Sequence, residues 1–515
     1  MLGLSYLSPS FFLPWPNALQ DFFAIMALII LTTSTIFKKN IEIGERTLYI
    51  FLFILLIPIL QYVSRILVFR QELFLSILYI GVFFLSIVNG TNLQKSLISI
   101  IDLSIFFTII GLICVLLQLV QWSGVYHSSF ILESNPLRPS ANLGQPNNLA
   151  TLLFISLFSN LYLFRKNKIE SWLYITINIT LVLGIVLTQS RTSWIVFVAL
   201  LLLSYLKKDL SLFSTVVKNS ALFFLLVLFI PYITLFVHGK GLNFVERIYS
   251  DSSRLDIWQQ IIIAIFDRPW LGYGWNQTSV AQTEASLKYP MDIWLEYSHN
   301  MFLDIIVWNG IPLGLIIIGI IVTWFFRSYK RVTSTDELIY YFIIVTFFIH
   351  CMLEFPFAYA YFLLPVGLYV GFLNNKIDDS GIISINKPSI FLVAIFSVIF
   401  SAIVKDYISL SNKRDDYSRK YLFSQEIKTS SSELIILDAL DLNNDILFLD
   451  TCDILRNKKS YQLRDVFYRY PTNKNLTTYY KSTIYNKLDS KVSTKYMLLK
   501  YPGFKYNLSS DNKCS

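Results

Sequence analysis

The sequence has 515 residues, 54% of them hydrophobic, and a formal net charge of +9 at neutral pH. No soluble core could bury so much apolar surface, so this composition excludes a soluble globular protein and predicts an integral membrane protein. Apolar windows of about 20 residues recur along most of the chain, which is typical of helical spans and not of a β-barrel. The basic residues lie in loops and in a C-terminal tail, where they report membrane topology, so no nucleic-acid partner is expected.

We predict an all-α polytopic membrane protein with about twelve transmembrane helices. In chain order these spans cover about 20–37, 47–66, 72–90, 101–121, 148–164, 171–188, 192–206, 220–237, 300–326, 337–352, 357–373 and 388–408. Residues 1–17 are apolar, short and interrupted by proline, which favours an interfacial or half-inserted segment. We expect a transmembrane domain at 1–409, with a large loop at 238–299, and a small, polar, helical C-terminal domain at 410–515.

Basic residues in short loops set the predicted orientation, because they concentrate on the cytoplasmic side. If the spans alternate, four basic segments share that side, at 38–46, 165–168, 207–218 and 327–331. The opposite, outer side then receives the loops at 122–147 and 238–299, the turns at Arg191 and Glu354, and the tail. The N-terminus also falls outside, so either residues 1–17 conceal another crossing or the first span inserts tail-first.

Arg65 and Arg70 fall on the outer side, against the charge rule. Gln61 lies near them, and Gln118 and Gln121 share one face of a later span. These amides either line an outer cavity or form ordinary hydrogen bonds between helices, and we favour the second interpretation.

The loop before the fifth span ends in RPSANLGQPNN at 138–148. Its amides are Asn142, Gln145, Asn147 and Asn148. Amides suit sugar hydroxyls, although glycine, proline and asparagine also occur here for turn chemistry alone. Because the amides lie beside Arg138, we favour a substrate-binding site.

Arg191 lies in the very short connection TQSRTSW at 188–194. Ser190 or Thr192 is expected to cap the following helix, whose N-terminal N–H groups and dipole favour an anion. An arginine fixed there is a good phosphate ligand. Simple snorkelling of Arg191 to the interface is the alternative, and the outer side is the wrong one for a topological charge.

The large loop is predicted to contain an amphipathic helix that lies on the membrane or covers a cavity. Residues 251–253 supply caps, Pro269 ends the helix, and Arg254 falls in its first turn. The apolar positions at helical spacing are Leu255, Trp258, Ile262 and Ile265. An aromatic, glycine-rich turn follows at 267–276, where Tyr273 either stacks on a sugar or anchors at the interface.

A polar cluster at 296–300, EYSHN, leads directly into the ninth span. His299 and Asn300 therefore lie at the mouth of a membrane helix, with Asp304 one turn below. Polar groups at this depth usually mark function, although a helix cap with an interfacial histidine explains them equally well. Further along, 309–312 should bend the span, and Glu354 lies in a tight outer turn.

Cysteine and histidine give no metal motif, because the four histidines are scattered and no HExxH or CxxC occurs. We expect no metal and no cofactor. Cys452 and Cys514 in the tail either form a disulfide, if the tail is extracytoplasmic, or remain two unpaired thiols.

Five motifs together resemble the O-antigen ligase/polymerase superfamily, and most closely the bacterial protein O-oligosaccharyltransferases that glycosylate pilins. They are RPSANLGQPNN at 138–148, TQSRTSW at 188–194, SRLDIW at 253–258, RPWLGYGWN at 268–276 and HNMFLDIIVWNGIPLG at 299–314. The protein-glycosylating branch often carries histidine where this chain has Asn148, and the chain is about one span shorter at its start than such relatives.

The resemblance implies transfer of an oligosaccharide en bloc, with inversion and without a metal, from a polyprenyl-diphosphate carrier to a Ser or Thr of a type IV pilin. The implied location is the bacterial inner membrane, with the active face towards the periplasm. Arg191 and Arg254, with Arg138 as a weaker third, would bind the diphosphate. His299 would act as general base or orient a substrate.

Three other functions are alternatives to pilin glycosylation. A ligase to lipid A core and a repeat-unit polymerase belong to the same enzyme class. A flippase or other transporter is disfavoured because the polar residues gather at one face instead of lying at mid-span.

Overall fold

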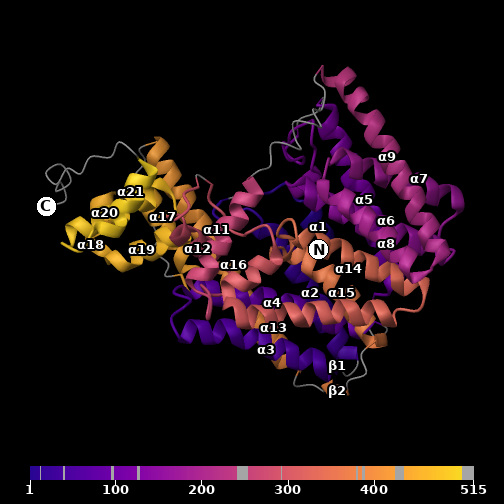
Figure 1. Ribbon diagram of the computed structural model, residues 1–515, viewed down its shortest axis with the longest axis horizontal. Coiled ribbons are helices and arrows are strands. Elements are labelled where there is room, and N and C mark those ends of the chain that lie inside the picture. The colour runs from indigo at the N-terminus through magenta and orange to yellow at the C-terminus, as the bar shows by residue number, and fades with distance from the viewer. Residues whose placement is uncertain are drawn as a thin grey trace. The chain divides into compact units, whose positions relative to one another are not determined.

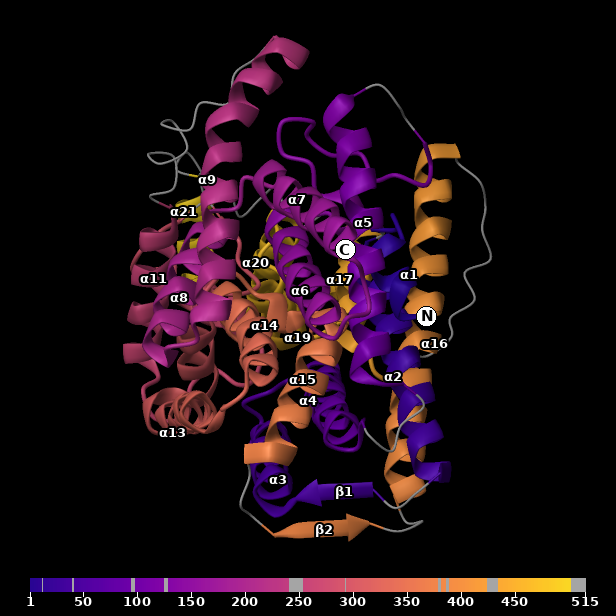
Figure 2. The same ribbon diagram turned by 90° about the vertical axis from the view of Figure 1, so that its right-hand side faces the viewer.

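The computed structural model describes residues 1–515 except 12, 39–40, 94–97, 125–127, 240–252, 292, 378–380, 386–388, 424–433 and 502–515 (Figure 1). Apart from turns and two short strands, the described chain is helical, as predicted. The two strands, β1 (Ile41–Gly44) and β2 (Ile382–Ile385), pair antiparallel with Ile41 opposite Ile385 (Figure 2). This pairing was not predicted, because each strand is only four residues long and its partner is remote.

Eight of the described helices are long and apolar enough to cross a membrane, which makes the chain a multi-pass membrane protein. They are α2 (Ala18–Lys38), α3 (Glu45–Val63), α4 (Arg70–Thr91), α5 (Ile100–Ser123), α6 (Pro146–Arg165), α9 (Leu210–His238), α13 (Met301–Arg331) and α16 (Ser389–Phe423).

The remaining four predicted spans also correspond to helices. They are α7 (Ser171–Leu187), α8 (Arg191–Lys207), α14 (Thr335–Cys351) and α15 (Ala360–Ile377). Each has 17 or 18 residues. Such a helix is about 26 Å long, slightly less than a hydrocarbon core of about 30 Å, so crossing by these four stays a prediction.

Local sequence explains where several helices begin and bend. Ser99 and Asp102 form a capping box at the start of α5, and Ser334 and Glu337 do the same for α14. Within α13, Gly310 has φ 75° and ψ 169°, which interrupts the helix two residues before Pro312. The predicted bend at 309–312 is therefore confirmed.

The chain divides into two compact units, each built from separate stretches of sequence. Unit 1 comprises Met1–Leu52, Tyr79–Asp251 and Ile321–Ile395, and unit 2 comprises Phe53–Leu78, Ser252–Ile320 and Phe396–Ser515. Helix α16 continues through the predicted domain boundary at 409/410 without a break.

Helix α6 is the centre of unit 1 and is buried along nearly its whole length between α5, α7 and α14 (Figure 2). Its approach to α5 requires a glycine, because a Cβ on Gly111 would lie 2.3 Å from the Ser156 hydroxyl. A short first helix, α1 (Leu2–Leu7), also belongs to this unit, and the Tyr6 hydroxyl donates to the Tyr361 carbonyl.

One end of α6 carries the predicted cytoplasmic loops. Arg165 and Lys166 both pair with Asp336, at 3.3 and 2.6 Å. The Lys207 ammonium donates to the Tyr329 carbonyl in the middle of the 327–331 segment. Three of the four basic segments, which are far apart in sequence, thus meet at this end, as the charge rule predicted.

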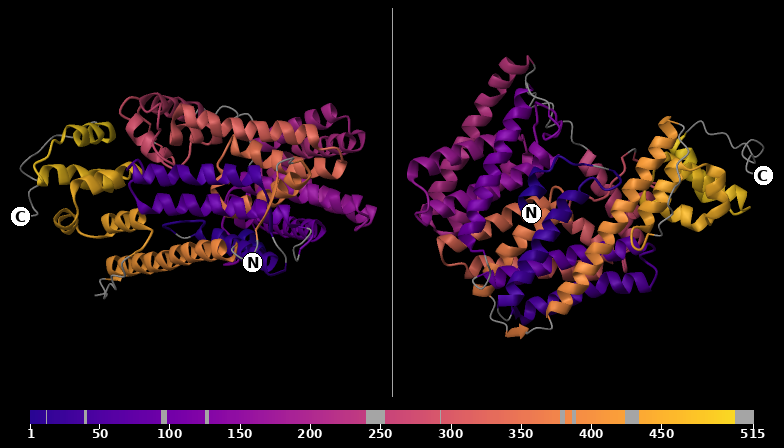
Figure 3. Two further views of the ribbon diagram at one scale, coloured as in Figure 1. Left: turned by 90° about the horizontal axis from the view of Figure 1, so that it is seen from below. Right: turned by 180° about the vertical axis from the view of Figure 1, so that it is seen from behind.

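Unit 2 contains α11 (Ser253–Asp267), α12 (Thr278–Ala285) and a C-terminal bundle, which we define as α17–α21. The bundle consists of α17 (Asp438–Phe448), α18 (Thr451–Asn457), α19 (Ser460–Arg469), α20 (Asn473–Tyr485) and α21 (Lys491–Lys500) (Figures 1 and 3). It has its own core, centred on Leu463, Phe467 and Tyr480. The helical character predicted for the C-terminal domain is confirmed in these residues. Cys514, which would form a disulfide with Cys452 in one of the two interpretations, lies outside the described residues.

The C-terminal bundle explains why Arg70 is an exception to the positive-inside rule. Asp438 accepts hydrogen bonds from the backbone N–H groups of Arg70 and Gln71, and so caps α4. The Arg70 guanidinium also lies 3.5 Å from the Asp438 carboxylate. Arg70 therefore pairs with an acidic residue of the bundle instead of marking topology.

Candidate active site

In unit 1, Arg138, Asn147 and Glu354 meet at the end of α6 opposite the basic loops. The Asn147 amide donates to Glu354 at 3.2 Å, and its oxygen accepts from the Arg138 guanidinium at 3.4 Å. Asn147 and Glu354 are both 7% exposed. Three of the predicted site residues are therefore brought together, about 27 Å along α6 from Arg165.

The same loop contacts the turn before α8. Arg138 Nε donates to the Thr188 carbonyl at 3.2 Å, and the Gln189 amide donates to the Leu137 carbonyl at 2.5 Å. Gln189 has φ 50°, a left-handed conformation that is uncommon for a residue with a side chain. These contacts place Arg138 close to the start of α8, and the role of Gln189 was not predicted.

Arg191 is the first residue of α8 and its side chain is exposed. The predicted position at a helix N-terminus is thus confirmed. The predicted side-chain cap is not found, because the Ser190 hydroxyl makes no capping hydrogen bond. The Thr188 hydroxyl takes part in the turn instead, accepting from the Ser190 N–H at 3.2 Å and donating to the Ile185 carbonyl at 2.6 Å.

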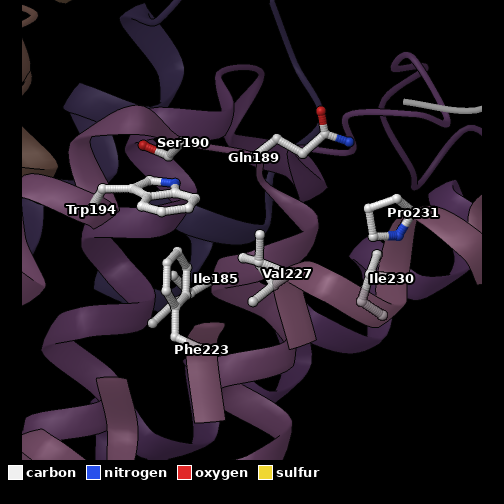
Figure 4. A pocket seen from close by; sticks show the side chains of 9 residues that line it. Ile185, Gln189, Ser190, Trp194, Phe223, Val227, Ile230 and Pro231 are labelled. Carbon is white, nitrogen blue, oxygen red and sulfur yellow. The ribbon is translucent and has the colours of Figure 1, made fainter. Parts of the chain in front are cut away.

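An apolar groove lies beside Ser190, between the end of α7, the start of α8 and α9 (Figure 4). Its lining is Ile185, Val186, Gln189, Ser190, Trp194, Phe223, Val227, Ile230 and Pro231. The Ser190 hydroxyl is buried and has no hydrogen-bond partner among the described residues. The groove is therefore hydrocarbon-like, with Gln189 and Ser190 as its polar members and Arg191 next in sequence.

The other predicted amides of the 138–148 segment differ in their environment. Asn142 is 1% exposed; its oxygen accepts from the Leu132 N–H, and its nitrogen donates to the carbonyls of Leu7 and Phe130. These bonds occupy the Asn142 amide. They favour a structural role, in which Asn142 holds the loop, and disfavour the predicted contact with substrate. Gln145 is half-buried, and its side chain makes no hydrogen bond to the residues that the structure describes.

Glutamines of the spans form structural hydrogen bonds, as we favoured. Gln121 accepts from the N–H groups of Ser140 and Ala141, and Gln118 donates to the Gly184 carbonyl. In unit 2, Gln61 donates to the Trp308 carbonyl at 3.1 Å.

His299 and Asn300 precede α13 in unit 2. The Asn300 carboxamide oxygen accepts from the N–H groups of Phe302 and Leu303, at 3.0 and 3.2 Å. This is the helix cap that the sequence offered as an alternative to a substrate contact. His299 is half-buried and has φ 59°, so the turn presents its imidazole from a left-handed backbone conformation.

Asp304 supports the loop that carries His299. One of its carboxylate oxygens accepts from the Ser298 N–H at 2.9 Å and from the Thr278 hydroxyl at 2.8 Å. The Trp308 indole donates to the same Thr278 hydroxyl at 2.7 Å. Asp304, one turn below Asn300, therefore holds the backbone next to His299 together with Thr278, which no sequence motif singled out.

Helix α11 connects Arg254 with the same loop. Arg254 is its second residue, as predicted, although the predicted caps at 251–252 lie outside the described residues. The Trp258 indole, one turn along the helix, donates to the Ser298 carbonyl at 3.1 Å. Arg254 and His299 are therefore linked through one helical turn and one hydrogen bond.

The buried face of α11 differs from the predicted apolar stripe. The buried apolar residues are Ile257, Ile261, Ala264 and Ile265, of which only Ile265 belongs to the stripe. Leu255 and Ile262 are exposed, so α11 has one apolar face towards the protein and a second towards its surroundings. An exposed apolar face suits the predicted contact with the membrane.

The glycine-rich turn at 268–276 packs by its backbone against the bend in α13. The N–H groups of Tyr273 and Gly274 donate to the carbonyls of Val307 and Trp308, both at 2.9 Å. Tyr273 itself is 2% exposed, and the Arg268 guanidinium lies 4.5 Å from its ring centre. Burial raises the pKa of its phenol well above the usual range. This packing favours a structural role for Tyr273 over the predicted sugar contact.

The predicted residues thus form two groups. Arg138, Asn147 and Glu354 meet near Arg191 in unit 1, and His299 and Asn300 lie with Arg254 in unit 2. Among the described residues, no group of three or more His, Cys, Asp or Glu side chains could hold a metal ion.

Comparisons with known proteins identify the family of this chain. Residues 176–337 match the O-antigen ligase family, and residues 339–456 match the C-terminal family of virulence factor membrane-bound polymerases. A ComP-specific O-oligosaccharyltransferase of Acinetobacter baylyi is 33% identical over 509 residues, which cover 95% of this chain and 92% of that protein. A general O-oligosaccharyltransferase of the same organism is 29% identical over 429 residues, 79% of this chain and 74% of that protein.

Similarity to the first relative runs through both units and the C-terminal bundle, because it covers nearly the whole of each chain. The chain therefore belongs to the O-oligosaccharyltransferases of the O-antigen ligase family, and is a multi-pass membrane glycosyltransferase.

Proposed function

We propose that the protein transfers an oligosaccharide en bloc from a polyprenyl-diphosphate carrier to a Ser or Thr hydroxyl of a periplasmic protein, a type IV pilin. The observation that carries the donor half of this proposal is the position of Arg191, a cation on the first residue of α8 directly after the groove residue Ser190. A diphosphate joined to an isoprenoid needs such a pairing of positive charge with an apolar surface.

Inverting transfer by direct displacement needs a nucleophile on one side of the sugar and a stabilised leaving group on the other. The acceptor oxygen forms a bond to the anomeric carbon while the bond from that carbon to the diphosphate oxygen breaks. Charge then develops on the diphosphate, and without a metal only protein cations can stabilise it. Arg191 and Arg254, each in the first turn of a helix, are suited to this task, with Arg138 as a third cation.

His299 is the residue that we assign to the acceptor. Removal of the hydroxyl proton by His299 would increase the nucleophilicity of the acceptor oxygen as the new bond forms. Its half-buried position at the mouth of α13 suits this role. Orientation of the acceptor or of the diphosphate by the same imidazole is the second assignment for this residue.

The groove beside Ser190 is assigned to the first isoprene units of the carrier. Its lining is almost entirely hydrocarbon, so an isoprenoid would bury apolar area there without leaving polar groups unpaired. Sugar-binding contacts are assigned to Gln145, Asn147 and Glu354, which lie at the same end of α6 as Arg138.

A pilin acceptor is favoured by the relative that is named for specificity towards ComP. Ligation to lipid A core or polymerisation of repeat units is the second candidate, favoured by the descriptions of the two matching families. Identity over nearly the full length of the ComP-specific protein weighs towards protein glycosylation.

The proposed setting is the bacterial inner membrane, crossed about twelve times, with the active face in the periplasm. Support comes from unit 1, where the basic loops lie at one end of α6 and Arg138, Asn147 and Glu354 lie at the other. The positive-inside rule assigns the basic end to the cytoplasm.

Coexpression with a pilin and a lipid-linked oligosaccharide tests the proposal. An increase in intact pilin mass by one whole oligosaccharide, with unchanged lipopolysaccharide, is the expected result. Modified lipopolysaccharide with unmodified pilin would overturn the choice of acceptor in favour of ligation. Reporter fusions that place residues 238–299 in the cytoplasm would overturn the periplasmic active face.

A further inference from the structure

Arg469, the last residue of α19 in the C-terminal bundle, is buried between three segments that are distant in sequence. Its Nε donates to the Glu72 carboxylate at 2.6 Å, and its Nη1 donates to the Ser279 hydroxyl at 2.9 Å. Its Nη2 lies 3.4 Å from the Glu296 carboxylate. The side chains of Arg469 and Glu72 are only 3% and 1% exposed.

A guanidinium in this position is held firmly. Glu72 supplies the buried negative charge that compensates Arg469, because either ion alone would be buried without a counter-charge. The planar fork then directs its remaining N–H groups to Ser279 and Glu296 in fixed directions. Glu296 lies three residues before His299, so the guanidinium reaches the loop that carries the proposed catalytic histidine.

Helix α12 forms a second connection between the C-terminal bundle and that loop. On one side, its Thr283 hydroxyl donates to the Tyr468 carbonyl, and the Tyr496 hydroxyl donates to the Thr283 carbonyl, both at 3.1 Å. Ser279 receives the hydrogen bond from Arg469. Three residues of the bundle and two residues of α12 are thus joined by side-chain hydrogen bonds.

The other side of α12 faces the loop before His299. Gln282 donates to the Ile293 carbonyl at 2.6 Å and accepts from the Leu295 N–H at 2.8 Å. Thr278 donates to Asp304, which in turn accepts from the Ser298 N–H. This eight-residue helix therefore lies between the bundle and the loop, with hydrogen bonds to both.

We propose that the C-terminal bundle positions the 293–299 loop through Arg469 and α12, and that Arg469 is a positioning residue of the transferase. This rests on the proposed function in one respect, that His299 acts on a substrate. The bundle would then support the active site, because it holds the loop that carries His299. It would also lie on the same side of the membrane as His299, because Arg469 and Glu296 are in contact.

Hydrogen exchange of the full-length protein, followed by mass spectrometry, measures the position of the loop without using activity. The informative amides are Leu295 and Ser298, because their N–H groups are bonded to Gln282 and Asp304. In Arg469→Gln we expect exchange at these two amides to accelerate on the order of tenfold. Amides in the middle of α11 and α13 should keep their wild-type rates.

A paired variant separates positioning from folding. Glu72→Leu with Arg469→Met removes both buried charges together, which typically leaves stability unchanged or improved. It also removes the hydrogen bond to Ser279 and the contact with Glu296, so faster exchange at Leu295 and Ser298 is again expected. The matched control is Arg464→Gln, since Arg464 is an exposed arginine of the same helix whose partner is its neighbour Asp465.

Kinetics give the second measurement. Both Arg469 variants should lower kcat about 10–100-fold with little change in KM for the lipid-linked donor, as expected for a displaced catalytic group. Wild-type exchange at Leu295 and Ser298 in the paired variant, or acceleration spread equally over the whole of unit 2, would overturn the proposal. If the wild-type protein transfers no oligosaccharide, the proposed function fails, while the exchange rates still test the position of the loop.

Discussion

Asn147 donates a 3.2 Å hydrogen bond to Glu354, which lies 207 positions later in the chain. The oxygen of the same amide accepts from Arg138, so a single neutral side chain lies between a guanidinium and a carboxylate. Both Asn147 and Glu354 are nearly inaccessible to solvent, which makes their hydrogen bonds sensitive to charge. This contact allows a role of Glu354 in substrate binding to be separated from its contribution to folding.

Replacement of Asn147 by Asp should place two carboxylates against each other in a buried position. We expect Asn147→Asp to lower the free energy of unfolding by about 1–3 kcal/mol and to reduce transfer activity. The double variant Asn147→Asp with Glu354→Gln restores one amide and one carboxylate in exchanged positions, and should recover most of that stability. Thermal unfolding in detergent and transfer to pilin measure the two effects.

The exchanged pair also tests whether the Glu354 carboxylate contacts the substrate. If it does, the double variant folds normally but stays at least about tenfold less active than the wild type. Recovery of both stability and activity would assign Glu354 to folding alone and remove it from the predicted site.

Asn142 should behave differently from Asn147. Its amide holds the backbone at Leu7, Phe130 and Leu132, so Asn142→Ala leaves buried donors and acceptors unpaired. We expect a loss of about 1–3 kcal/mol in stability and an unchanged kcat for the fraction that remains folded. A normal melting temperature with a raised KM for the donor would show that Asn142 binds substrate after all.

Asn142 and Asn147 show where prediction from the sequence stops. Both lie in the same amide-rich segment, 138–148, and an amide that binds a backbone carbonyl has the same sequence signature as one that binds a sugar. Only the remote partners distinguish them, namely Leu7 for Asn142 and Glu354 for Asn147. For Tyr273 the sequence likewise left a sugar contact and an interfacial anchor open, because an aromatic residue in a glycine-rich turn does not reveal its burial.

The fold was more predictable than the site. Long apolar windows identify helices through composition alone, and Gly310 with Pro312 identifies the bend, because these residues act locally. The pairing of β1 with β2 and the contact of Arg469 with Glu72 depend on segments that are hundreds of residues apart. No local pattern encodes such contacts, so the sequence could not indicate them.

Two glycines should be essential where the 268–276 turn packs against α13. A Cβ on Gly310 would lie 2.3 Å from the Trp270 carbonyl oxygen, and a Cβ on Gly272 would lie 2.6 Å from the Gly310 nitrogen. Both residues also have positive φ. Gly310→Ala and Gly272→Ala should each lower the free energy of unfolding by about 1–3 kcal/mol.

The matched control for the glycines is Gly319→Ala in the same helix, where nothing lies within 4 Å of the added Cβ. Alanine is the better helix former, so this variant should melt at the wild-type temperature or slightly above it. Equal melting temperatures for Gly310→Ala and Gly319→Ala would contradict the close approach of the two backbones.

The groove beside Ser190 predicts a dependence on the length of the isoprenoid. Val227→Phe narrows the groove, and should raise KM for a long-chain donor about five- to tenfold, which corresponds to about 1 kcal/mol of lost apolar contact. A donor with a single short prenyl unit should show a smaller effect. Leu228→Phe is the control, because Leu228 is 67% exposed and is not part of the groove lining. Equal effects of the two variants on both donors would show that the groove holds only bulk lipid.

His299 can be replaced without changing the backbone that presents it. Its φ of 59° is tolerated by asparagine better than by most residues, so His299→Asn should fold like the wild type while it lacks the imidazole. We expect His299→Asn to lower kcat about 10²–10⁴-fold, with donor binding retained. His299→Val also lacks the imidazole, and its β-branched side chain strains the backbone at this φ, so this variant should lose stability as well.

Intact mass of the coexpressed pilin measures transfer, and thermal unfolding measures the stability of the fold. Full glycosylation by His299→Asn would remove the histidine from the mechanism. If His299→Asn instead loses both kcat and melting temperature, His299 would have a structural role in the loop.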